Sequence, residues 1–239
     1  MNTEIWLCEI TGQPIPLHDC LECAEHRQVP ACPFPPTVLK ALANSMRGDD
    51  GLLEAQALAQ RAGVALLRVT SLLGCTRQAW YGLHGRPPLE KPSAHWSRLR
   101  GTIFHAALES LAGENAVAET RLIASLEELG ARAWIAGKID HYDPALRLAT
   151  DYKTINTFEL PKQHHVAQLW IYGWLLGKSG YPYPLTSRIV YMDMGAVRTV
   201  DVAMPDADMQ AAVEARLVEK AQLITEADHA GPPGDPQEP

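Results

Sequence analysis

The most constraining feature of this chain is a pair of short polar motifs that one strand–turn–strand unit would bring together. The first is Gly137-Lys138-Ile139-Asp140 and the second is Asp151-Tyr152-Lys153-Thr154. The segment between them, His141-Tyr142-Asp143-Pro144-Ala145, has the composition of a turn. The residues at 146–153 alternate with the period of a strand, which places Asp151 and Lys153 on one face. We therefore expect two paired strands, at about 133–140 and 146–153.

This arrangement of charges suits one class of chemistry. Carboxylates on two neighbouring strands can hold a hard divalent cation through their oxygens. Such a cation polarises a phosphate and activates a water molecule. A nearby ammonium can orient that water or neutralise charge that builds up in the transition state. Asp140, Asp151 and Lys153 together therefore indicate metal-assisted hydrolysis of a phosphodiester bond.

The order of the remaining elements predicts the fold class. We expect helices at about 37–46, 52–62, 70–83, 97–111, 161–176 and 206–227, and further strands at about 119–126, 187–194 and 197–203. Residues 1–36 are rich in Cys and Pro without sustained periodicity, and the Pro/Gly tail at 231–239 should be disordered. The pattern predicts an α/β domain at 37–230, with a mixed central sheet flanked by helices, after a small Cys-rich metal-binding segment at 1–36.

The length and composition of the chain limit its class and its expected location in the cell. The chain has 239 residues and is 46% hydrophobic, which is enough for a full core. No stretch approaches the roughly 20 apolar residues of a membrane span. The start, Met1-Asn2-Thr3-Glu4, lacks the basic residues and apolar run of a signal peptide. We therefore expect a cytoplasmic protein without a membrane partner, in which cysteines act as metal ligands or thiols and not as disulfides.

The charge is unevenly distributed along the chain. The net charge is -7, yet the segment at 61–105 contains seven Lys or Arg residues against Glu90 alone. From Asp201 onward there are nine acidic residues against two basic ones. A basic segment within an acidic protein favours a local groove for a polyanion. Scattered solvated arginines would give the same count.

Four motifs occur in one order. They are Arg100-Gly101-Thr102-Ile103-Phe104-His105 on an expected helix, the Gly137 and Asp151 motifs on strands, and Gln168-Leu169-Trp170-Ile171-Tyr172 on a later helix. In the last motif Gln168 and Tyr172 are four residues apart and share a helix face. The set resembles the RecB-like branch of the PD-(D/E)XK nuclease superfamily, and within it the CRISPR-associated RecB-family exonuclease.

The resemblance implies a restriction-endonuclease-like fold and a role for each matching residue. His105, Asp140, Asp151 and the carbonyl of Tyr152 would ligate Mg²⁺ or Mn²⁺, with Glu119 as a further carboxylate. Lys153 would be the catalytic lysine. Gln168 and Tyr172 would line the DNA groove or support Lys153. Arg77 matches a basic position near the DNA path, and Arg98 and Arg100 belong to the same basic segment.

The cysteines form a second candidate site. Cys20 and Cys23 form a Cys-x-x-Cys pair, which Cys8 and Cys32 flank. Four thiolates suit tetrahedral zinc, which would stabilise a segment with little core of its own. The chain departs here from the family it resembles, whose iron–sulfur members have one cysteine before the core and three after it. Cys75 matches the early position, but no cysteine follows it. The alternative is an iron–sulfur cluster that joins Cys75 to three of the N-terminal thiols.

The leading hypothesis is a metal-dependent DNA nuclease, an exonuclease or end-trimming enzyme that acts on single strands. Its setting would be CRISPR adaptation and antiviral defence, or recombination and repair. The partners would be DNA with free ends and a CRISPR integrase or recombination protein. The alternative is a non-catalytic, zinc-bearing adaptor that binds DNA ends. Lys153 beside two carboxylates favours the enzyme, because a pure binding protein has no need of that arrangement.

Overall fold

The computed structural model describes residues 5–46, 50–84, 89–113, 115–156, 161–193 and 195–226. The chain divides into two compact units. The first contains Met1–Asp49 and Pro87–Ala106, and the second contains Asp50–Arg86 and Ala107–Pro239. Each has a separate apolar core. The tail expected to be disordered, 231–239, lies outside the described residues.

The first unit is a small module of helices around a hairpin. Strands β1 (Ile5–Leu7) and β2 (Pro14–Pro16) pair antiparallel, and α1 (Leu17–Glu25) and α2 (Pro36–Met46) follow. A short 3-10 helix, η1 (Pro92–His95), leads into α6 (Trp96–Glu109). Five buried side chains form its core: Trp6, Leu39, Leu42, Ala43 and Leu99.

No helix was expected within residues 1–36, yet Leu17–Glu25 form α1. Helix α1 packs one stripe against the core of the first unit, made of Leu17, Cys20, Leu21 and Ala24. These positions follow the helical spacing of three and four residues. The stripe was not recognised from the sequence because one of its members, Cys20, was interpreted only as a metal ligand.

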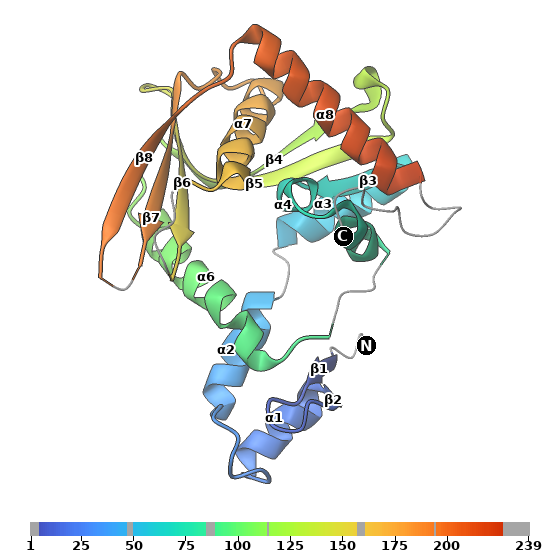
Figure 1. The fold of residues 1–239 in the computed structure, drawn as a ribbon, viewed down its shortest axis with the longest axis vertical. Helices are drawn as coiled ribbons and strands as arrows, with labels where there is room; N and C mark the ends of the chain where they lie inside the picture. The colour runs from blue at the N-terminus through green and yellow to red at the C-terminus, as the bar shows by residue number, and fades with distance from the viewer. Residues whose placement is uncertain are drawn as a thin grey trace. The chain divides into compact units, whose positions relative to one another are not determined.

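The second unit is built on a mixed sheet, six-stranded over the described residues. Strand β5 (Ala133–Asp143) pairs antiparallel with β4 (Val117–Ser125) along one edge. On its other edge it pairs first with β3 (Ala65–Arg68), in parallel, and then with β6 (Leu148–Thr154), antiparallel. Strand β7 (Thr186–Met192) continues the sheet parallel to β6, and β8 (Val197–Ala203) closes it antiparallel (Figure 1).

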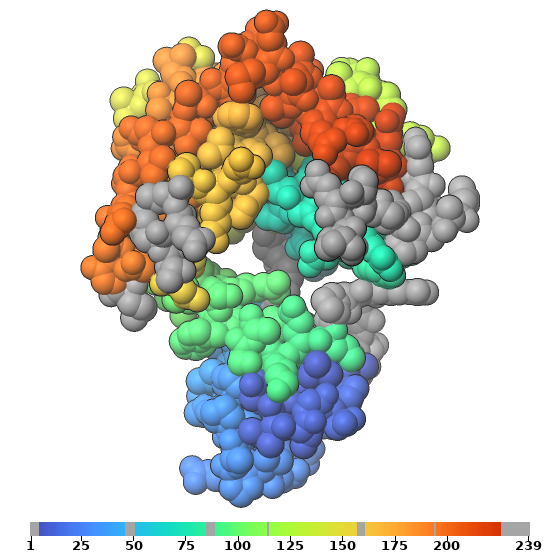
Figure 2. Space-filling model, viewed as in Figure 1, coloured from blue at the N-terminus to red at the C-terminus, as the bar shows by residue number. Residues whose placement is uncertain are grey.

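Helices cover this sheet, which confirms the predicted α/β fold. Helix α7 (Gln163–Lys178) contacts β4, β5 and β6, while α3 (Asp50–Ala62) contacts β3, β4 and β5. Helix α8 (Ala207–Glu226) packs on α7 and on two short helices, α4 (Val69–Leu73) and α5 (Thr76–Leu83). Figure 2 shows the side chains of α8 beside those of α4 and α5 on the surface of this unit.

The helix expected at 70–83 is interrupted, and the expectation of one continuous helix is wrong. Helix α4 ends at Leu73 and α5 begins at Thr76, because Gly74 and Cys75 are extended. The ammonium of Lys220 on α8 donates to the carbonyls of Leu72 and Gly74, at 2.7 and 2.5 Å. This contact with a distant helix satisfies carbonyls at the break. Within the described part of the chain, every helix is too short or too polar to cross a lipid bilayer.

Candidate active site

The candidate site lies where the edge of β5 changes partner. Strand β3 pairs with β5 as far as Ala136, and β6 pairs with it from His141 onward. Gly137 to Asp140 lie between these two ladders. Here the carboxylate of Asp140 accepts the backbone N–H of Tyr152, Oδ2 to N, at 2.7 Å. Asp140 is thereby fixed beside the stretch of β6 that contains Asp151 and Lys153.

Glu119 adds a carboxylate from the opposite edge of β5. On β4, Ala118 pairs with His141 and Thr120 with Ile139, so Glu119 faces Asp140 where the ladder is interrupted. Its φ of +46° is uncommon for a residue with a side chain. The carboxylate is 8% exposed and lies 2.6 Å from the ammonium of Lys138. Carboxylate oxygens of Glu119 and Asp140 lie within 4.8 Å of one another.

Asp151 and Lys153 form a close ion pair inside the unit. Asp151 is 1% exposed, and the Nζ of Lys153 lies 2.9 Å from its Oδ1 and 2.8 Å from its Oδ2. The ammonium of Lys153 therefore compensates the charge on both oxygens of this buried carboxylate. Carboxylate oxygens are the ligands that hard cations prefer, so the donor set of Glu119, Asp140 and Asp151 fits a hard metal ion.

Gln168 and Tyr172 lie against this site on α7. Both are buried, and the amide of Gln168 donates to the hydroxyl oxygen of Tyr172 at 3.0 Å. Burial raises the pKa of Tyr172, and the negative charges of Asp151 and Asp140 raise it further. The phenol therefore stays protonated within electrostatic range of both carboxylates.

Gly137 allows Tyr172 to approach β5. A Cβ at this position would lie 2.6 Å from Cε1 of Tyr172 and 2.7 Å from Cγ2 of Val69. Such distances are shorter than van der Waals contact, so a larger residue would push Tyr172 away from the sheet. The glycine that precedes Asp140 is thus explained by close packing with α7.

The second unit brings together most of the residues expected at the site: Glu119, Asp140, Asp151, Lys153, Gln168 and Tyr172. Tyr152 follows Asp151, and both burial and the Asp140 charge raise its phenolic pKa. Arg77 is exposed on α5 in the same unit. Arg98, Arg100 and His105 lie on α6 in the first unit, and their roles stay predictions.

Two histidines were missed by the sequence analysis. His165 is buried, and its Nδ1 lies 2.9 Å from the hydroxyl of Tyr191. Burial, with a smaller contribution from the charge of Lys153, lowers the pKa of His165 to about 4. His164 lies beside it, with the ring centroids 4.3 Å apart. Helical spacing in the sequence could have identified them. His164 and His165 precede Gln168 by four and three residues, which places all three on one side of α7.

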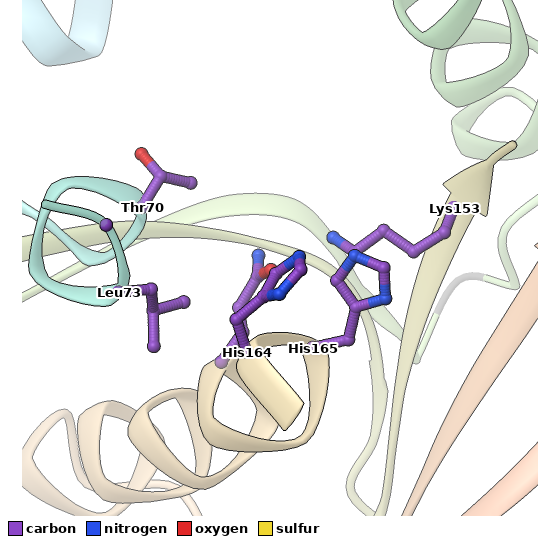
Figure 3. A pocket seen from close by; sticks show the side chains of 7 residues that line it. Thr70, Leu73, Lys153, His164 and His165 are labelled. Carbon is purple, nitrogen blue, oxygen red and sulfur yellow. The ribbon is translucent and has the colours of Figure 1, made fainter. Parts of the chain in front are cut away.

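His164 and His165 border a pocket beside Lys153. It has a volume of about 370 Å³ and is lined by residues of α4, β6 and α7: Thr70, Leu73, Gly74, Lys153, His164, His165 and Gln168. In Figure 3, Lys153 extends from β6 toward His164 and His165, while Thr70 and Leu73 face them from α4.

The N-terminal cysteines lie in the first unit and form no disulfide. Over the residues that the structure describes, no three thiols lie within 4.8 Å of one another in a ligand group. Burial, with smaller contributions from the nearby thiols of Cys32, Cys8 and Cys23, raises the pKa of Cys20 to about 11. The four thiols are therefore within electrostatic range, although their sulfurs are not gathered as in a metal-bound cluster.

Comparison with known proteins shows similarity in fold. No protein-family model matches the chain, and no curated protein matches it in sequence. The crystal structure of SSO0001 superposes with a TM-score of 0.53 at 20% identity, covering 78% of this chain and 84% of that one.

Two further solved structures share less of the fold. A phage-related exonuclease from Haemophilus somnus 129PT gives a TM-score of 0.44 at 13% identity, over 67% of this chain and 93% of the other. A putative exonuclease from Eubacterium rectale gives 0.47 at 12% identity, over 76% and 88%. The chain thus has a mixed α/β fold that is similar to that of SSO0001.

Proposed function

We propose that this protein is a metal-dependent nuclease that hydrolyses phosphodiester bonds of DNA, and that it acts on single strands from an end. The observation that carries the proposal is the contact between Lys153 and the buried carboxylate of Asp151, beside Asp140. A carboxylate pair that holds a divalent cation, with an adjacent ammonium, would be complementary to the negative phosphodiester and could activate the attacking water.

The carboxylates supply the ligands that the proposal needs. Glu119 and Asp140 offer oxygens close to one another, and Asp151 offers a further, buried carboxylate. Oxygen ligands of this kind suit Mg²⁺ or Mn²⁺. We assign His105 and the carbonyl of Tyr152 as further ligands on the basis of the motif order. A cation bound here would polarise the phosphate and lower the pKa of a water molecule.

The other residues of the site act around these ligands. Lys153 would orient the water or neutralise charge on the phosphate. Gln168 and Tyr172 are joined by a hydrogen bond on α7 beside the carboxylates, and Gly137 lets Tyr172 pack closely on β5. Arg77, Arg98 and Arg100 would contact the phosphates of the bound strand.

The resemblance in the motifs also suggests a setting. We propose that the substrate DNA reaches this site during CRISPR adaptation, recombination or repair, with an integrase or recombination protein as the partner. This part of the proposal rests on the motif order alone. Identification of proteins that co-purify with the chain from its host would test it.

A structural zinc site is proposed for the first unit. Its ligands would be Cys8, Cys20, Cys23 and Cys32, whose charges already influence one another. Cys75 lies at the start of α5 in the second unit and is left out of the zinc site. The alternative is an iron–sulfur cluster held by Cys75 and three of these thiols.

The nuclease proposal is tested with end-labelled DNA. The purified protein is incubated with single- and double-stranded oligonucleotides in Mn²⁺ and in EDTA, beside Lys153→Ala. Lys178→Ala is the matched control, because Lys178 is an exposed lysine in the last turn of α7. We expect the parent protein and the control variant to cleave DNA in Mn²⁺ but not in EDTA. Lys153→Ala should not cleave in either condition. Binding without cleavage, equal in all three proteins, would favour the adaptor that binds DNA ends.

A further inference from the structure

The pocket beside Lys153 is larger than the chemistry at the carboxylates requires. Its volume of about 370 Å³ lies at the lower end of the range for small-ligand pockets, roughly 300–1,000 Å³. That size can accommodate a single nucleobase. Lys153, which would face the scissile phosphate, also lines the pocket. A nucleotide attached to that phosphate therefore has the pocket within reach.

The lining combines flat, apolar and polar groups. The imidazole of His164 is exposed to solvent and lies beside His165, while Leu73 supplies an apolar wall from α4 (Figure 3). Histidine rings offer a stacking surface for bases of single strands. Thr70 and Gln168 supply polar atoms that can contact the edge of a base.

The wall formed by α4 is held from outside. Lys220 on α8 donates to the carbonyls of Leu72 and Gly74, which anchors the end of α4 that borders the pocket. On the other side, His165 is fixed by its contact with the hydroxyl of Tyr191. The pocket is therefore shaped before any ligand binds, which lowers the entropic cost of binding.

We infer that this pocket binds one unpaired nucleobase, that of the terminal nucleotide next to the scissile phosphate, with the base stacked on His164. The inference deepens the proposed nuclease function and rests on it. A paired base would first have to leave its base pair and its stack, at a cost in free energy, so the pocket would supply a preference for single strands. Base stacking on an aromatic side chain contributes about 5- to 150-fold to binding.

The test measures binding without cleavage. Fluorescence anisotropy in EDTA compares an eight-residue thymidine oligonucleotide with versions that lack the base at the 5′ end, at the 3′ end or in the middle. We expect removal of the base at one end to weaken binding by about 5- to 150-fold, and removal in the middle to have a clearly smaller effect. Equal losses at all three positions would overturn the inference.

Variants link that preference to the pocket. Leu73→Trp fills the pocket and should abolish the difference between oligonucleotides, whereas Leu146→Trp, at an exposed leucine in the β5–β6 turn, should preserve it. If Leu73→Trp does not fold, two variants at His164 provide the test instead. His164→Ala should lose the preference and His164→Phe should retain it, because phenylalanine keeps the stacking face. Equal behaviour of these two His164 variants would contradict stacking on this residue.

The outcomes separate the two proposals. Cleavage in Mn²⁺ without a preference for a terminal base would leave the nuclease function standing and remove the pocket assignment. A terminal-base preference in EDTA without cleavage in Mn²⁺ would remove the nuclease function, and the pocket would then be a binding site for strand ends.

Discussion

The carboxylate of Asp140 accepts the backbone N–H of Tyr152, at 2.7 Å between Oδ2 and N. A side chain here takes the place of a backbone acceptor, at the point where the ladder between β5 and β6 stops. The contact fixes one carboxylate of the site against the backbone next to the other, Asp151. The same hydrogen bond therefore replaces the backbone pairing of β5 with β6 and positions the carboxylate of Asp140 in the site.

The first prediction concerns metal binding. Mn²⁺ should raise the midpoint of thermal unfolding, because it binds the folded carboxylates and not the unfolded chain. Each kcal/mol of stabilisation corresponds to roughly 2–4 °C in a chain of this size. Asp140→Asn should remove most of the rise, whereas Glu128→Gln, at an exposed glutamate in the 3-10 helix Glu127–Leu129, should keep it. An equal rise in both variants would place the metal elsewhere. Differential scanning fluorimetry with and without EDTA measures the effect.

The second prediction concerns the packing of α7 on β5. Gly137→Ala should reduce the free energy of unfolding by about 1–3 kcal/mol, because the added Cβ overlaps Tyr172 and Val69. Gly82→Ala is the matched control, since no atom lies within 4 Å of a Cβ at that helical position. That control should be neutral or slightly stabilising. Urea denaturation compares the two, and similar losses would show that Gly137 is not closely packed.

The third prediction concerns pH. His165 is surrounded by Lys153, Lys162, His164 and the hydroxyl of Tyr191, and its pKa is lowered to about 4, chiefly by burial. As the pH falls from about 6.5 to 4, the unfolded chain takes up a proton that the folded chain does not, so stability should fall by roughly 2–3 kcal/mol. His165→Asn should lose less stability over this window than the parent protein.

The control for this pH effect is His26→Asn, at an exposed histidine in the first unit. It should keep the full pH dependence. Urea unfolding at a series of pH values gives the slopes, and an unchanged slope in His165→Asn would assign the effect to other groups.

The fold was predicted more completely than the site. The strand expected at 146–153 and the helix expected at 161–176 match β6 and α7 within about two residues at each end. Strand β3 was missed because it has only four residues and exists through its pairing with β5. The pocket could not be predicted either, since Thr70, Lys153 and His164 meet only through tertiary packing.

The fourth prediction concerns the cysteines. Protein purified under reducing conditions should contain about one zinc ion per chain, because four thiols lie within electrostatic range of one another. Cys20→Ser should lose the metal, and Cys75→Ser should retain it. Elemental analysis measures the content. Iron with acid-labile sulfide in place of zinc would support the cluster alternative, and metal-free protein that folds normally would remove both.

The most direct test of the account is the initial rate of cleavage of a labelled single strand in Mn²⁺ by the parent protein, Asp151→Asn and Glu128→Gln. If the buried carboxylate of Asp151 holds the metal beside Lys153, Asp151→Asn should be slower by roughly a hundredfold or more, and Glu128→Gln should be unchanged. Equal rates in all three proteins would contradict the assignment of this site as the active centre.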